Sequence, residues 1–94
     1  NGELVGVISF KILGDILDIH RLMVSPFHFR KGIAKNLLQF VETLDNSINQ
    51  IIVSTASRNT PAVNFYKKYG FSELDTIKVS ENLYLSSFKK KINS

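Results

Sequence analysis

Apolar and polar residues alternate along several short stretches of the chain, and this pattern predicts β-strands. Two such stretches, residues 4–12 and 16–24, are rich in Val, Ile and Leu, and Gly14-Asp15 between them is a turn signal. A connection this short predicts an antiparallel hairpin. The same pattern predicts three further strands, at residues 50–55, 71–79 and 83–88.

After Gly32 the spacing of apolar residues changes to that of an amphipathic helix. Apolar residues recur at helical spacing at positions 33, 37, 38, 41 and 44. They predict a helix of roughly 12–14 residues that fades at residues 45–47, which favour turns. A second helix is expected with Thr60 as its N-cap, Pro61 at its first position and Gly70 beyond its end.

The expected elements alternate in the order β-β-α-β-α-β-β, which is an α/β pattern. The second strand, the first helix and the third strand form a βαβ unit, so these two strands are expected to pair in parallel. The remaining neighbours are expected to pair antiparallel. We therefore expect a mixed, mostly antiparallel sheet with two helices. The 94 residues suffice for one domain, taken as residues 1–94.

Composition narrows the chemistry that the chain can perform. It has no cysteine, which excludes disulfides, thiolate metal sites and a cysteine nucleophile. Two histidines are too few for a structural zinc site without thiolates, so no metal is expected. The absence of cysteine fits a reducing compartment, and a cytoplasmic location is expected. Neither a long apolar run nor a signal-peptide pattern is present, so no membrane association is expected.

The chain is basic, with a net charge of +4, and its positive charge is concentrated in two places. Basic chains often bind nucleic acid. This one has no recognisable nucleic-acid-binding motif and no aromatic–basic platform, so no nucleic acid is expected. The lysines at residues 89–91 are expected to form a solvated tail. Arg30, Lys31 and Lys35 surround a predicted strand-to-helix turn, which is the better candidate for a functional site.

This turn, residues 24–34, has the features of a phosphate-binding turn. The first amides of a helix have no internal partner and carry the positive end of its dipole, so a diphosphate there accepts several N–H bonds. Gly32 and Ala34 allow close approach of the backbone. The three basic side chains add positive charge. On spacing alone, a structural turn with a solvated basic face is an equally good interpretation.

Two motifs together resemble the GNAT superfamily of N-acetyltransferases. The coenzyme motif of that family, Gln/Arg-x-x-Gly-x-Gly/Ala, follows a strand that ends in Leu-x-Val-x-Pro. This chain has Leu22-Met-Val-Ser-Pro26 and then Phe29-Arg-Lys-Gly-Ile-Ala34, with Phe29 where Gln or Arg is usual. The second motif, Asn-x-x-Ala-x-x-Phe-Tyr-x-x-x-Gly-Phe, is matched at every named position from Asn59 to Phe71. The resemblance covers about residues 3–90.

The resemblance implies a GNAT-like acyl-CoA N-acyltransferase fold. It also implies an enzyme that moves an acetyl group from acetyl-CoA directly to a primary amine. In such a fold the second and third strands splay apart to admit the pantetheine arm, and the amide of Met23 or Val24 polarises the thioester carbonyl. The implied coenzyme-binding residues are Met23, Val24, Phe29, Arg30, Lys31, Gly32, Ile33, Ala34, Lys35 and Asn59.

Tyr66 is the implied general acid, because the tyrosine at this place in the family often protonates the leaving thiolate. The alternative is a core aromatic residue on an amphipathic helix. Asn59 is either a coenzyme contact or a turn residue before the N-cap. Asp18 and His20 are candidate bases, since residues two apart on a strand share a face. A water relay is the alternative base, and a structural role is the alternative for both side chains.

The resemblance further implies a strand, two helices and another strand before residue 4, which this sequence lacks. We therefore expect either the C-terminal part of a longer protein or a compact variant. In a compact variant, a second subunit would cover the exposed edge at residues 4–12, so a homodimer is expected. The alternative to an active enzyme is a non-catalytic acyl-CoA-binding module or an inactive acetyltransferase-like domain. The sequence does not specify the acceptor amine.

Overall fold

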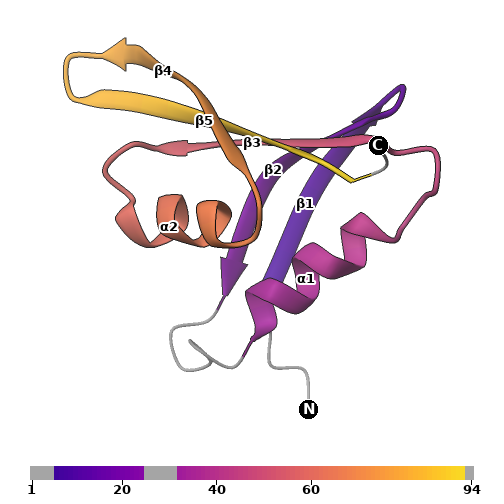
Figure 1. Ribbon diagram of the computed structural model, residues 1–94. Helices are drawn as coiled ribbons and strands as arrows, with labels where there is room; N and C mark the ends of the chain where they lie inside the picture. The colour runs from indigo at the N-terminus through magenta and orange to yellow at the C-terminus, as the bar shows by residue number, and fades with distance from the viewer. Residues whose placement is uncertain (1–5, 25–31, 93–94) are drawn as a thin grey trace.

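The computed structural model describes residues 6–24 and 32–92, which form a five-stranded sheet with both helices on one of its faces (Figure 1). The elements follow one another in the expected order β-β-α-β-α-β-β. They are β1 (Gly6–Leu13), β2 (Ile16–Val24), α1 (Ile33–Glu42), β3 (Gln50–Ala56), α2 (Thr60–Lys68), β4 (Ser72–Ser80) and β5 (Leu83–Lys91).

The strands lie in the order β1-β2-β3-β5-β4 across the sheet. Three of the four pairings are antiparallel, and the exception is the parallel pair β2–β3. Helix α1 makes the crossover between these two strands, because a hairpin turn cannot connect parallel neighbours. The expected mixed, mostly antiparallel sheet is therefore confirmed.

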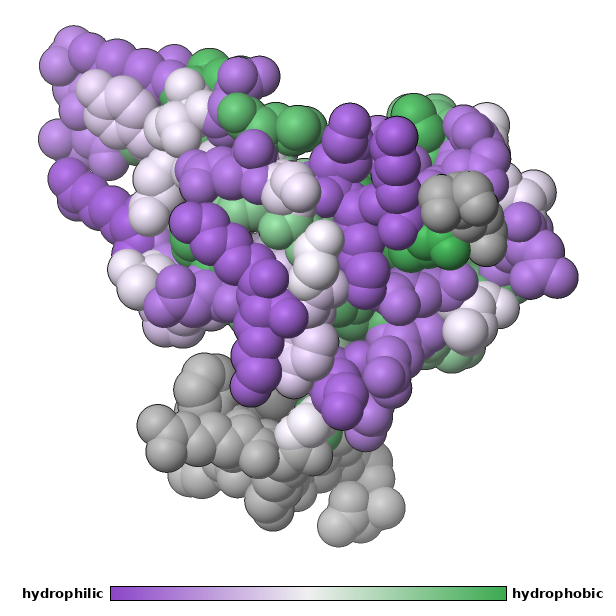
Figure 2. All heavy atoms as spheres, in the orientation of Figure 1, coloured by the Kyte–Doolittle hydropathy of each residue, from purple (hydrophilic) through white to green (hydrophobic). Residues whose placement is uncertain are grey.

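The hydrophobic core fills the space between the sheet and the two helices. Alternate residues of β2, β3 and β5 are buried on this side, as the period of a strand requires. The buried hydrophobic residues are Leu17, Ile19, Leu38, Val41, Ile48, Ile51, Val53, Tyr66, Phe71 and Phe88. The molecule presents mainly hydrophilic residues on the side drawn in Figure 2, with hydrophobic residues in small separate areas.

Helix α1 is shorter than its apolar periodicity predicted. It ends at Glu42 after ten residues, whereas roughly 12–14 were expected from the repeat. The hydroxyl and the amide of Thr43 both donate to carbonyl groups of the last turn, at 3.2 Å. Asp45 then accepts bonds from the amide and the hydroxyl of Ser47, at 2.9 and 2.8 Å. These local side-chain bonds end the helix in favour of a turn.

The prediction that Thr60 caps α2 was wrong. Asn59 is the N-cap, and its Oδ1 accepts a hydrogen bond from the Ala62 amide at 3.3 Å. Thr60 and Pro61 are therefore the first two residues of the helix. Pro61 fits the second position as well as the first, because the amides of the first turn have no intrahelical acceptor.

The lysines near the C-terminus do not form a solvated tail, which corrects a second prediction. β5 continues to Lys91, and residues 89–91 pair with residues 50–52 of β3. Lys90 points to the helical side, where its Nζ lies 2.7 Å from Oε2 of Glu42 in α1. The other strand ends differ from the prediction by one or two residues. Residues 4 and 5 lie outside the described part of the chain.

Candidate functional site

Helix α1 begins as a phosphate-binding turn requires. Its N-cap Gly32 has φ +76° and ψ +11°, the left-handed region that glycine adopts without strain. The Asn36 amide bonds to the Gly32 carbonyl at 2.9 Å. The amides of Ile33, Ala34 and Lys35 therefore precede the first intrahelical bond. Among the described residues no side chain caps this end, and the first turn has no acidic residue.

The parallel ladder between β2 and β3 covers only the first part of each strand. It runs from the Ile16–Gln50 pair to the Ile19–Val53 pair. Both strands continue beyond it, and Figure 1 shows them diverging from this point. After Ile19, no described strand therefore pairs with the edge of β2 that faces β3. The splaying that the resemblance implied is thus present.

A β-bulge coincides with the point where β2 leaves β3. In the β1–β2 ladder Ser9 pairs with Arg21, but the next residue, Phe10, pairs with Ile19. His20 is therefore an extra residue on β2. An extra residue bends its strand and increases the local twist. The bulge thus gives a physical cause for the divergence, and the sequence pattern contained no sign of it.

Gly6 is a site residue that sequence reasoning missed. A Cβ atom at Gly6 would lie 2.9 Å from Cγ2 of Ile33 and 3.3 Å from the carbonyl oxygen of Met23. Glycine therefore lets the first turn of α1 pack closely against the end of the β1–β2 hairpin. The available signal was a glycine inside a strand of β-branched residues, which often marks close backbone approach.

The expected coenzyme-binding residues fall into three groups. Met23 pairs with Val7 of β1 and lies beyond the point where β2 pairs with β3, and its side chain is half-exposed. Val24 ends that strand. Gly32, Ile33, Ala34 and Lys35 form the start of α1. Phe29, Arg30 and Lys31 lie outside the described residues. The first two groups therefore flank the β2–α1 connection, and Gly6 lies next to both the Met23 carbonyl and Ile33.

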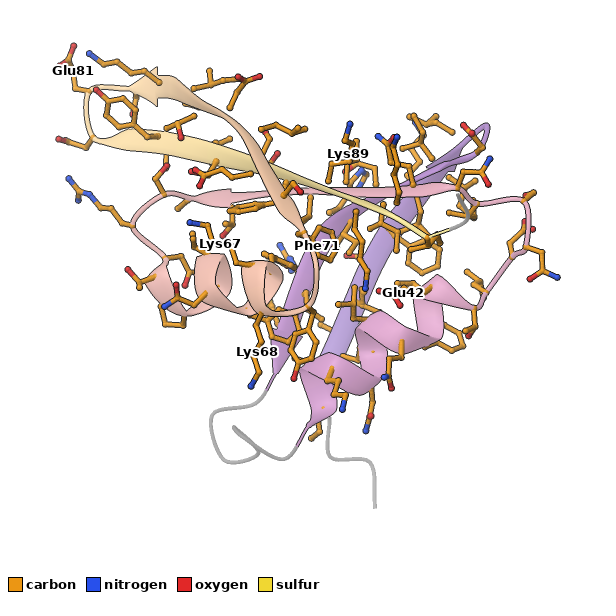
Figure 3. The ribbon with its side chains drawn as sticks, viewed as in Figure 1. Glu42, Lys67, Lys68, Phe71, Glu81 and Lys89 are labelled. Atoms are coloured by element: carbon orange, nitrogen blue, oxygen red, sulfur yellow. The ribbon has the colours of Figure 1, made fainter. Side chains whose placement is uncertain are left out.

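Tyr66 lies on the buried side of α2 and is 5% exposed. Its ring centroid lies 5.3 Å from that of Phe71, which is labelled in Figure 3, and 5.8 Å from that of Phe88. Burial raises the pKa of Tyr66 to about 12, because the phenolate would lose its hydration. A tyrosine is protonated at neutral pH even at the ordinary pKa of 10.0, as a general acid must be, and burial extends this protonated range to higher pH.

Asp18 and His20 lie together on β2, with Oδ2 of Asp18 3.5 Å from Nε2 of His20. Both side chains are partly exposed. Leu17, before the pair, and Ile19, between its two members, point into the core. The pair thus lies on the face of the sheet opposite Tyr66.

Asn59 is itself the N-cap of α2 and not a turn residue before it, while the expected coenzyme contact stays a prediction. It caps α2 through Oδ1, which explains the residue structurally. The Nδ2 group of an asparagine carries two further donors, so a capping Asn59 can still bond to a ligand.

No group of three or more His, Asp or Glu side chains in residues 6–24 and 32–92 is placed to hold a metal ion. Neither of the two helices described is long and apolar enough to cross a membrane. The absence of a metal cofactor and of a membrane partner stays a prediction from composition.

Comparison with known proteins decides the family. The sequence model of the Acetyltransferase (GNAT) family matches residues 1–71, which include both motifs. The chain belongs to the GNAT family. UPF0157 protein YqkA of Bacillus subtilis (strain 168) is 47% identical over 88 residues, which are 94% of this chain and 26% of that protein. Streptothricin acetyltransferase of Escherichia coli is 36% identical over 73 residues, 74% of this chain and 42% of that protein.

A solved N-acetyltransferase structure confirms the fold. PaiA N-acetyltransferase from Thermoplasma acidophilum, in complex with coenzyme A, matches with a TM-score of 0.77 and 26% identity. The matched region covers 93% of this chain and 53% of that one. The GNAT chain described here thus spans about half of PaiA, less than half of the streptothricin enzyme and about a quarter of YqkA.

Proposed function

We propose that this GNAT chain transfers an acetyl group from acetyl-CoA to a primary amine by direct attack. The observation that carries the proposal is the free edge of β2 beyond Ile19, next to the uncapped start of α1. The amides of a pantetheine arm can pair with a free strand edge in the manner of an added strand. The diphosphate is then expected at the first turn of α1. The coenzyme A in the PaiA complex supports this choice of ligand.

The chemistry assigns one task to each group. The neutral amine attacks the thioester carbonyl carbon, and the Met23 or Val24 amide donates to the carbonyl oxygen as negative charge develops there. When the C–S bond breaks, Tyr66 protonates the departing thiolate. The proton of the amine goes to Asp18, to His20 or to a water molecule.

The acceptor amine is open to several classes, and the name of one relative suggests where to begin. Streptothricin acetyltransferase is 36% identical over the matched region. Streptothricin therefore belongs in an amine panel with polyamines, peptide N-termini and lysine side chains.

The alternative function is a non-catalytic acyl-CoA-binding module, which the atypical Phe29 motivates. Coenzyme binding without turnover on any amine of the panel would favour it.

A calorimetric titration with acetyl-CoA tests the coenzyme site. Gly32 has a left-handed backbone, and no described atom lies within 4 Å of the position its Cβ would take. Asn and Asp both tolerate that conformation and have nearly the same shape, but only Asp adds a negative charge. We expect Gly32→Asp to weaken binding at least about tenfold more than Gly32→Asn, which corresponds to about 1.4 kcal/mol.

Equal losses of acetyl-CoA affinity in the two variants would show that the substitution acts through the backbone conformation at residue 32 and not through charge next to a diphosphate. A parent protein that does not bind acetyl-CoA would contradict the proposed coenzyme site itself.

A further inference from the structure

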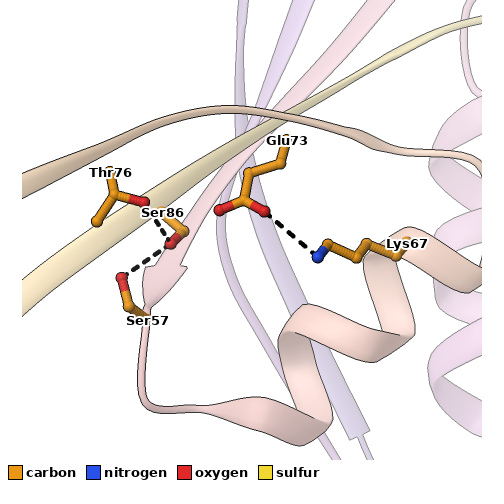
Figure 4. A network of polar contacts seen from close by, with 5 residues as sticks. All are labelled: Ser57, Lys67, Glu73, Thr76 and Ser86. Atoms are coloured by element: carbon orange, nitrogen blue, oxygen red, sulfur yellow. Dashed lines mark hydrogen bonds and ion pairs between the residues drawn. The ribbon is translucent and has the colours of Figure 1, made fainter.

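Helix α2 is attached to the β4–β5 hairpin at both of its ends (Figure 4). Near its end, Nζ of Lys67 lies 3.3 Å from Oε1 of Glu73 in β4. Before its start, the Ser86 hydroxyl of β5 lies 2.8 Å from the Ser57 hydroxyl and 3.2 Å from that of Thr76 in β4. Three segments that are distant in sequence therefore meet at one serine.

Ser86 is unusual among the residues that the structure describes, because it is the only polar one in the buried class, with 3% exposure. A buried hydroxyl without a partner is costly, so such groups are nearly always hydrogen-bonded. A serine can donate one bond and accept others. Ser86 can therefore bond to Ser57 and Thr76 at the same time, which makes the three hydroxyls a continuous hydrogen-bonded chain.

The hydroxyl chain fixes the turn that begins α2. The Ser57 amide donates to the carbonyl of Tyr84 at 2.9 Å, so this turn is bonded to β5 through both backbone and side chain. Two residues later, Asn59 caps the helix through the Ala62 amide. The nine residues of α2 then include Tyr66 on the buried side. Because so short a helix moves as a unit, a displacement of the turn displaces the phenol.

β5 also contacts the phenol directly. Phe88, two residues beyond Ser86 and on the same face of β5, has its ring centroid 5.8 Å from that of Tyr66. One strand thus holds the start of α2 through a hydroxyl and the Tyr66 side chain through a ring.

We propose that Ser86 is a positioning residue for acetyl transfer. Through the Ser57–Ser86–Thr76 hydroxyl chain it sets the place of α2, and thereby the distance from the Tyr66 hydroxyl to the sulfur of the departing thiolate. Ser86 itself touches no reacting atom. This inference rests on the proposed function, in which Tyr66 is the acid.

The chain provides a matched control one residue away. Ser87 points to the opposite face of β5, where its hydroxyl lies 3.1 Å from that of Ser54 in β3. Ser86→Ala and Ser87→Ala therefore each remove one hydroxyl from the same strand and break a cross-strand serine pair. Only the first acts on α2. Thr76→Val, at an exposed position, interrupts the same hydroxyl chain without altering the buried serine.

Amide hydrogen exchange tests the attachment without any need for turnover. In Ser86→Ala we expect faster exchange at the amides of Ser57, Asn59 and Val63, which are hydrogen-bonded at 2.9, 2.9 and 3.0 Å. Amides of the β1–β2 hairpin should keep the parent rates, which distinguishes a local change from loss of stability. Thr76→Val should act in the same direction. The attachment is refuted if Ser86→Ala and Ser87→Ala give the same exchange pattern.

A double-mutant cycle with Tyr66→Phe then tests the link to catalysis. We expect Ser86→Ala to lower kcat about tenfold in the parent and less than about twofold when Tyr66 is already Phe, because coupled residues are not additive. Equal fold losses in the two backgrounds would show that Ser86 does not act through Tyr66. A parent without turnover on any amine would end the proposed function and the catalytic role of Ser86 together, while the exchange result would still decide the attachment.

Discussion

The phenol ring of Tyr66 is surrounded by the rings of Phe65, Phe71 and Phe88, whose centroids lie 5.3 to 5.8 Å from its own. The same burial that contributes to the core keeps the proton on the hydroxyl. Structural and catalytic roles for Tyr66 are therefore compatible, and the two interpretations of the sequence motif need not exclude each other.

The raised pKa of Tyr66 has a consequence for stability at alkaline pH. Below pH 10.0, the ordinary value, the phenol is protonated in both the folded and the unfolded chain. Above it the unfolded chain loses the proton first, so the folded state becomes less favoured until its own pKa of about 12 is passed. We expect this group to remove about 2 to 3 kcal/mol of unfolding free energy over that interval.

Urea unfolding of the parent and of Tyr66→Phe between pH 9 and 12 would measure this loss as the difference between the two curves. Tyr84→Phe, which removes an exposed phenol, is the matched control. Parallel curves for the parent and Tyr66→Phe would mean that water reaches the hydroxyl in the folded protein.

At the scale of elements, local sequence pattern predicted most of the structure. The order of elements, the strand at residues 16–24, the hairpin turn and the parallel β2–β3 pair are confirmed. Two other features depend on partners distant in sequence, which local pattern cannot reveal. Lys90 is held by Glu42, 48 residues earlier, and Gly6 contacts Ile33 of a later helix.

The candidate site was predictable to a similar extent. Gly32 was selected for close backbone approach, and the structure adds a positive φ as a second reason. The bulge at His20 and the cap at Asn59 depend on register and on side-chain rotamers, which periodicity does not encode. The contributions of Phe29, Arg30 and Lys31 stay predictions, since these residues lie outside the described part of the chain.

The two ion pairs that attach helices to the sheet should differ in strength. Lys90 and Glu42 are 2.7 Å apart, with side chains 24% and 20% exposed. Lys67 and Glu73 are 3.3 Å apart, with side chains 53% and 39% exposed (Figure 4). We expect Lys90→Met to lower the unfolding free energy by about 1 to 3 kcal/mol, because it leaves a half-buried carboxylate without its partner.

For the matched variant Lys67→Met we expect a loss of at most about 1 kcal/mol, since solvent screens an exposed pair. Urea denaturation at neutral pH measures the unfolding free energy of both variants relative to the parent. Losses of equal size would show that the pairing of Glu42 with Lys90 contributes no more than a surface contact.

At the scale of the whole molecule, the described sheet is covered by helices on one face only, and its edges are β1 and β4. The β4 edge is interrupted by irregular register on either side of its centre and carries the charged residues Glu73, Asp75 and Lys78. Such features oppose pairing with another chain. β1 ends in the exposed apolar residues Ile12 and Leu13, and so it is the edge better suited to a second copy.

We therefore expect the sedimentation-equilibrium mass to rise toward that of a dimer with increasing protein concentration, because association would cover this edge. Leu13→Lys should keep the protein monomeric over the same range. Leu74→Lys, at a comparably exposed position of β4, should not. A parent that stays monomeric at high concentration would contradict the expected homodimer.

The short parallel ladder between β2 and β3 has one more consequence. Every helix and strand before residue 43 lies on one side of it, and every one after residue 49 lies on the other. Four backbone pairings therefore join two contiguous halves of the chain within the sheet. The common hydrophobic core, the Glu42–Lys90 ion pair and the hydrogen bonds of Asp15 with Asn49 and Gln50 also cross this boundary. A coenzyme in the opening beyond this ladder would contact both halves, so its binding would add to the contacts that already join them and should raise the stability of the whole molecule.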